Sequence, residues 1–294
     1  MKKPNFFIIG APKCGTTSMA VYLSEHPHVF MYPEKEPHFF NTDHNNPDRA
    51  KSLTEYLVGF QECNDNHLAV GEASTNYINS SVAVHNILCD ISDAKFVVMI
   101  RNPVDMARSL YDYQYFQGRE HIKSFVEAWH LNEKRKSGAP VSRHCPEPRY
   151  IAYGEMCRLG VQLQRLYTVV SPDLVSVVLL DDFKENPRRE YLKVLAHLGV
   201  PDDGRHDFPI SNPAMTRRSH FFREVVQAAW RIKKNLGFKK SWGILGVSNR
   251  NNSIKGNRTQ LQPEVSQMLF EYFLDDINLL GSLLGRDLER LWSR

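Results

Sequence analysis

The chain has 294 residues, of which 42% are hydrophobic and 11% aromatic, enough for a sizeable buried core. Its 37 Lys and Arg against 33 Asp and Glu leave a net charge of +4, too small to indicate nucleic-acid binding. The five cysteines are scattered without a C-x-x-C pair, which argues against a disulfide framework or a zinc site and favours a reducing compartment.

The first apolar run, from Phe6 to Ile9, is too short for a signal peptide or a membrane span. It reads instead as a short strand closed by Gly10, and helical spacing follows it directly. We therefore expect a cytoplasmic protein without a membrane span.

Strand and helix patterns alternate along the chain. The expected strands are 5–9, 95–100 and 174–180, and the expected helices are 17–25, 103 to about 116, and 188–198. This alternation predicts a single α/β domain over 1–294, with a central parallel β-sheet flanked by helices. Residues 221–236 are predicted to form an amphipathic surface helix, with membrane binding as the alternative, and 137–148 a loop.

A glycine loop, Gly10 to Ser18 (GAPKCGTTS), connects the first expected strand to the first expected helix. Backbone N–H groups and the positive end of the helix dipole converge on an anion in this setting. The loop is close to G-x-x-x-x-G-K-[ST], but Thr16 stands at the lysine position and Lys13 lies inside the loop. This arrangement suits one phosphate whose bridging oxygen gains charge, with Lys13 stabilising the leaving group. A plain glycine turn with a solvated Lys13 is the alternative.

The stretch IIGAPKCGTTSMAVYLSEHPHVFMYPEKEPHFF resembles the opening of the sulfotransferases that include bacterial enzymes and the heparan sulfate sulfotransferase domains. The resemblance implies a P-loop NTPase-like sulfotransferase fold and 3'-phosphoadenosine 5'-phosphosulfate (PAPS) as sulfuryl donor, with adenosine 3',5'-bisphosphate as product. The acceptor would be a hydroxyl or amine of a small molecule or carbohydrate, attacked in line. The resemblance assigns 5'-phosphosulfate binding to Lys13, Cys14, Gly15, Thr16, Thr17 and Ser18, with a backbone role for Cys14.

A second anion pocket is expected at Arg101, which follows the second predicted strand, because ligands gather along the carboxyl edge of a parallel sheet. A planar guanidinium suits phosphate oxygens. The resemblance assigns the 3'-phosphate of the donor to Arg101 and Ser109, whereas an ordinary surface ion pair is the alternative for Arg101. The segment with Lys255, Gly256 and Arg258 partly resembles a lysine–glycine loop that covers the donor, and a solvated basic turn fits it equally well.

Transfer to a hydroxyl or ammonium needs a base beside the loop. Glu72, in VGEASTNY, stands where the resembling heparan-type enzymes carry a catalytic glutamate, and its segment can be a strand beside the first one. Ala73 departs from the lysine common in relatives, which leaves the tuning of the glutamate and the acceptor open. A helix-capping or ion-paired glutamate is the alternative.

The segment KEPHFF, residues 35–40, brings a cation, an acid and an imidazole together. Lys35 would neutralise charge on the sulfuryl oxygens, and His38 would orient the acceptor or act as an alternative base, although a packed core histidine fits as well. No His, Asp or Glu spacing resembles a metal site, so no metal is expected.

Two other functions share this kind of loop. An ATP-dependent small-molecule kinase is disfavoured because Thr16 replaces the loop lysine. A non-catalytic nucleotide-binding module is favoured only if the candidate side chains point away from the loop. Aromatic residues at 39, 40, 77, 111, 113, 115 and 116 could line an acceptor pocket, but they do not identify the acceptor, and the oligomeric state stays open.

Overall fold

The computed structural model describes residues 2–33, 36–46, 49–137, 141, 145–209, 215–217, 253–255 and 261–293. Three candidate residues, Lys35, Gly256 and Arg258, lie outside these ranges, as does the expected helix at 221–236. Most of the expected loop at 137–148 is also outside them. Lys255 is described only as part of a strand backbone.

Five parallel strands form the central sheet in the order β2-β3-β1-β4-β5. They are β1 (Phe6–Gly10), β2 (Val29–Met31), β3 (Ala69–Ala73), β4 (Lys95–Ile100) and β5 (Val175–Leu179). Every residue of β1 is buried, and Phe7 stacks on Phe96 of β4 with ring centroids 6.1 Å apart. The all-parallel sheet confirms the fold class expected from the apolar strand runs.

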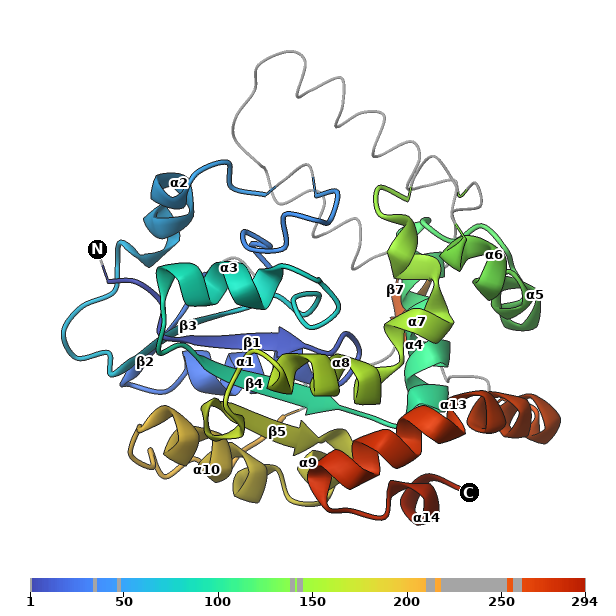
Figure 1. The fold of residues 1–294 in the computed structure, drawn as a ribbon. Helices are drawn as coiled ribbons and strands as arrows, with labels where there is room; N and C mark the ends of the chain where they lie inside the picture. Colours follow the sequence, from blue (N-terminus) through green and yellow to red (C-terminus); the bar gives the residue numbers. More distant parts are fainter. Residues whose placement is uncertain are drawn as a thin grey trace.

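Helices cover both faces of this sheet (Figure 1). The helices of the described residues are α1 (Thr16–Ser24), α2 (Leu53–Leu57), α3 (Ala83–Asp90), α4 (Pro103–Gln117), α5 (Phe125–His130), α6 (Asn132–Lys136), α7 (Tyr153–Met156), α8 (Leu159–Tyr167), α9 (Leu180–Glu185), α10 (Pro187–Leu198), α13 (Pro263–Leu284) and α14 (Leu288–Trp292). Short 3-10 turns are η1 (Val58–Phe60), η2 (Pro148–Ile151) and η3 (Pro172–Leu174).

The crossovers place α1 and α10 on one face, where Tyr22 and Tyr191 meet with ring centroids 6.5 Å apart. Helices α3 and α8 lie on the opposite face, and the long α13 packs against α8 and α4 (Figure 1). A small antiparallel pair, β6 (Met215–Arg217) and β7 (Ser253–Lys255), is separate from the main sheet. Among the described residues, no helix is both long and apolar enough to cross a membrane.

Local sequence signals explain the bounds of α4, the helix that carries Ser109 of the expected second anion pocket. Asn102 caps α4 by accepting a hydrogen bond from Val104 N at 2.9 Å, and Pro103 occupies the first helical turn. Gly118, with φ of 70°, ends the helix in the left-handed conformation. These signals confirm the helix expected from residue 103, and β4 has the same bounds as the expected strand.

Candidate active site

The glycine loop between β1 and α1 is held against the neighbouring strand, because Ala11 N donates to Met99 O at 2.7 Å. Gly15, with φ of 91°, precedes the first turn of α1 in the left-handed region. A Cβ atom there would lie 2.9 Å from Leu180 Cδ1, so space as well as conformation favours glycine. No acidic side chain occupies the first turn of α1, which leaves its positive end suited to an anion.

Two side chains of the loop take different directions. Lys13, with φ of 66°, places its Nζ 4.7 Å from the centroid of the Tyr113 ring on α4. Cys14 is completely buried, and its Sγ lies 3.4 Å from Pro12 O. Burial raises the pKa of the Cys14 thiol to about 12, so it stays neutral at ordinary pH. This burial is compatible with the backbone role expected for Cys14.

Arg101 follows β4 and reaches the same loop. Its Nη1 donates to Lys13 O at 3.3 Å, and its Nη2 pairs with Asp105 at 3.0 Å. The Nε atom is buried without a hydrogen-bond partner in the described part of the chain. Ser109 is buried on α4, two turns along. The structure therefore brings the two predicted anion pockets together at the carboxyl edge of β1 and β4.

Glu72 lies in β3, directly opposite Phe7 of β1, as expected for a strand beside the first one. Its side chain is completely buried. Three hydroxyl groups donate to its carboxylate: Tyr56 at 3.1 Å, Tyr77 at 2.7 Å and Ser74 at 2.6 Å. Burial raises the pKa of Glu72, although these hydroxyl groups oppose the shift. Its role as the base stays a prediction, and access of the carboxylate to an acceptor would require these contacts to rearrange.

Glu36 and His38 lie beside this buried carboxylate. The backbone N of His38 donates to Ser74 Oγ at 3.0 Å, so Ser74 bridges His38 to Glu72. His38 Nε2 lies 3.2 Å from Glu36 Oε2, and Thr75 Oγ1 donates to Glu36 Oε1 at 3.1 Å. The Glu36 side chain keeps 27% of its surface exposed. The sequence pattern contained this acid beside Lys35 and His38, but we assigned it no role.

Three residues of the candidate site have an unusual backbone conformation. Among the described residues, Lys13, Glu36 and His38 are the non-glycine residues with positive φ, at 66°, 64° and 51°. Such conformations are uncommon for residues with a side chain and gather at functional sites. All three belong to the two segments that the sequence singled out, which supports a functional site at this place.

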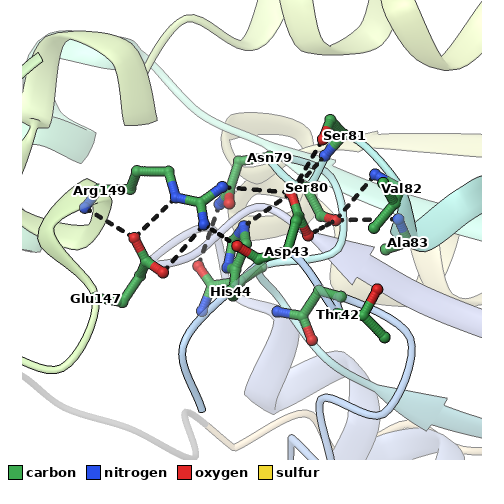
Figure 2. Close-up of polar contacts among 12 residues, drawn as sticks. Thr42, Asp43, His44, Asn79, Ser80, Ser81, Val82, Ala83, Glu147 and Arg149 are labelled. Carbon is green, nitrogen blue, oxygen red and sulfur yellow. Dashed lines mark hydrogen bonds and ion pairs between the residues drawn. The ribbon is translucent and has the colours of Figure 1, made fainter.

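A polar cluster of Asp43, Ser80, Ser81, Glu147 and Arg149 holds the segment that follows His38 through hydrogen bonds and ion pairs (Figure 2). Asp43 accepts hydrogen bonds from Ser80 Oγ at 2.5 Å and from Ser81 N at 3.0 Å, at the start of α3. Arg149 of η2 bonds to Asp43 and, at 2.8 Å, to Glu147. Burial by itself would raise the pKa of Asp43, but the Ser80 and Ser81 hydrogen bonds outweigh it and lower that pKa to about 2. The cluster therefore connects three separate segments through an ionised carboxylate.

In the part of the chain that the structure describes, no group of three or more His, Cys, Asp or Glu side chains could hold a metal ion. The fold and the site define an α/β protein with a glycine loop after its first strand and an arginine after its fourth, and the two are in contact. Residues 3–233 match the family described as sulfotransferase domain, so the chain belongs to that family.

Solved sulfotransferase structures have a fold similar to that of this chain. The fold is similar to that of a sulfotransferase from Alicyclobacillus acidocaldarius, with a TM-score of 0.74, 25% sequence identity and 100% of each chain covered. It is also similar to mouse sulfotransferase SULT7A1 complexed with PAP, with a TM-score of 0.50, 11% identity, and 94% of this chain and 86% of that chain covered. The latter likeness shows the fold alone.

A curated relative is the human bifunctional heparan sulfate N-deacetylase/N-sulfotransferase 2, which is 26% identical over 203 residues. The alignment covers 67% of this chain and 22% of that protein. The chain spans less than half the length of the first curated relatives it matches, with shares between 22% and 44% of their length.

Proposed function

We propose that this chain is a sulfotransferase that uses PAPS as its donor. The observation that carries the proposal is the contact between the two anion pockets, where Arg101 Nη1 donates to Lys13 O at 3.3 Å. A donor with a 5'-phosphosulfate and a separate 3'-phosphate needs two such pockets side by side. Membership of the sulfotransferase domain family supports the same donor.

The described residues fit this donor. Gly15 and the first turn of α1 would hold the 5'-phosphosulfate together with Lys13. Arg101, whose buried Nε lacks a partner among the described residues, would hold the 3'-phosphate with Ser109. When bound, the donor supplies the sulfuryl group. Lys13 would neutralise the negative charge that grows on the bridging oxygen as that group leaves.

The proton acceptor is proposed within the network of Glu72, Ser74, His38 and Glu36. Glu72 is our first candidate because of its place beside β1 and its raised pKa. Glu36 is the second candidate, favoured by a specific observation: its side chain keeps 27% of its surface exposed, whereas Glu72 is completely buried. A base must reach the proton it removes, so exposure favours Glu36 over the buried carboxylate.

The proposed acceptor is a hydroxyl or amine of a small molecule or carbohydrate. The human relative is named as a heparan sulfate N-deacetylase/N-sulfotransferase, which supports testing amino sugars first. The proposed kinase alternative predicts binding of ATP with magnesium. The non-catalytic alternative predicts binding of adenosine 3',5'-bisphosphate without any transfer.

Donor choice is tested by calorimetry of the full chain with adenosine 3',5'-bisphosphate and, separately, with ATP and magnesium. We expect binding of the bisphosphate. Preference for ATP with magnesium would contradict the proposal and support the kinase. Acceptors are then screened with PAPS carrying radiolabelled sulfur, and a chain that binds the bisphosphate but labels no acceptor would support the binding module.

The base is tested by single-turnover transfer with Glu36→Gln, Glu72→Gln and His38→Ala. Glutamine keeps the size and hydrogen-bonding reach of glutamate but takes no proton, so the variant lacking the base should lose roughly a hundredfold to ten-thousandfold in rate. Affinity for adenosine 3',5'-bisphosphate should persist in that variant. Wild-type rates for both glutamine variants, together with a silent histidine variant, would place the base outside this network.

A further inference from the structure

The ammonium group of Lys13 rests on an aromatic ring from a distant part of the chain. Its Nζ lies 4.7 Å from the centroid of Tyr113, which is 100 positions further along the sequence. A cation over an aromatic face within about 6 Å is attracted by the ring quadrupole. Tyr113 is 37% exposed, so its ring contacts the loop through Lys13 while part of it faces solvent.

Tyr113 continues a line of residues at four-residue intervals. Arg101 precedes α4, and Asp105, Ser109 and Tyr113 follow at one-turn steps on that helix. Residues four apart on a helix lie one above the other, about 6 Å apart along the axis. The helix side that carries Ser109, and Asp105 as the ion-pair partner of Arg101, therefore leads to the ring under Lys13.

The ring limits where the Lys13 ammonium can lie. A lysine side chain has four flexible carbon atoms, and holding it in one place costs rotamer entropy. The left-handed backbone at Lys13 sets the start of this side chain, and the Tyr113 ring holds its end. A favourable contact made before the reaction reduces the cost of placing the charge where it is needed.

We propose that Tyr113 is a positioning residue that holds the Lys13 ammonium ready for the bridging oxygen of the donor. This inference rests on the proposed function, because it assigns Tyr113 to the leaving-group role of Lys13. Cation–π contacts contribute more when they are shielded from water, so removing the ring is expected to slow donor cleavage by about 2- to 30-fold.

The test compares Tyr113→Leu and Tyr113→Met, which remove the ring, with Tyr113→Phe, which keeps it. Tyr167→Leu, at the far end of α8, is the matched control for the loss of a partly buried tyrosine. For each chain, adenosine 3',5'-bisphosphate affinity is measured by calorimetry, and the single-turnover rate of PAPS cleavage with water as acceptor is measured by release of sulfate. Melting temperatures report whether each variant is folded.

A double-mutant cycle with Lys13→Met separates positioning from a merely structural role. If Tyr113 acts through Lys13, Tyr113→Leu slows the wild-type chain but adds no further loss in the Lys13→Met background. Tyr113→Phe should lose much less than Tyr113→Leu. Equal losses for the Phe and Leu variants, or the same loss with and without Lys13, would overturn the inference.

Different results would overturn the proposed function and the inference about Tyr113. A wild-type chain that neither binds adenosine 3',5'-bisphosphate nor cleaves PAPS overturns the proposed function and, with it, this role of Tyr113. A wild-type chain that does both, with a Tyr113→Leu variant that matches the Tyr167→Leu control, overturns the Tyr113 inference alone.

Discussion

Replacing Arg101 with alanine should weaken donor binding strongly. The Arg101 side chain is only 9% exposed, and its Nε has no partner among the described residues. A hydrogen bond to a charged group contributes about 1.5–3 kcal/mol, so losing one such contact to a phosphate should weaken affinity about 10- to 150-fold. Because a 3'-phosphate contact is made equally in the ground and transition states, the donor KM should rise more than kcat falls.

Asp105→Asn is the matched control for this experiment. Asp105 is 60% exposed and pairs with Arg101 at 3.0 Å, so its carboxylate competes with a phosphate for the same guanidinium. We expect the asparagine variant to bind adenosine 3',5'-bisphosphate as tightly as the wild-type chain or more tightly. Calorimetry at fixed ionic strength measures both variants. Unchanged bisphosphate affinity in a folded Arg101→Ala chain would refute the assignment of the 3'-phosphate pocket.

Three further predictions concern catalysis, stability and pH. Lys13→Ala should lower kcat by about a hundredfold to a thousandfold with donor and acceptor saturating, and a retained kcat with chemistry rate-limiting would contradict its leaving-group role. Arg135→Met leaves Glu120 buried without its 2.7 Å ion-pair partner, and breaking such a pair costs about 3–5 kcal/mol, or roughly 5–8 °C in melting temperature for a chain of this length. Scanning calorimetry that shows no shift would refute the importance of this pair. Because the pKa of Asp43 is lowered to about 2, its ionised form stabilises the fold above its ordinary pKa and loses that effect as pH falls toward about 2. Asp43→Asn should therefore flatten the loss of stability between about pH 4 and 2 in urea titrations, and an unchanged slope would contradict this account.

The sequence predicted the central part of the sheet because its signals are local. The run at 95–100 became β4 with the same bounds, and Pro103 with Gly118 set the limits of α4. The three-residue strand β2 was not predicted, since it is too short to show a period of its own. The C-terminal helix α13 was also not predicted, and it is stabilised by packing against α8 and α4.

The candidate site also has parts that local sequence signals predicted and parts that they did not. The loop around Lys13 and the arginine before Pro103 were recognisable because glycine, lysine and proline stand at fixed short spacings between a strand and a helix. The parallel arrangement of β1 and β4 then follows from the alternation of strands and helices, and it places both segments at one edge of the sheet.

The environment of each side chain was decided only by the tertiary structure. The sequence identified Glu72 but could not show that Tyr56, Tyr77 and Ser74 would donate hydrogen bonds to its carboxylate, or that the Glu36 side chain would keep exposed surface. The contact between Lys13 and Tyr113 likewise depends on how β4 and α4 pack beside the loop. Periodicity and turn residues report local backbone preferences, whereas burial, pKa and side-chain contacts arise when segments far apart in the chain pack together.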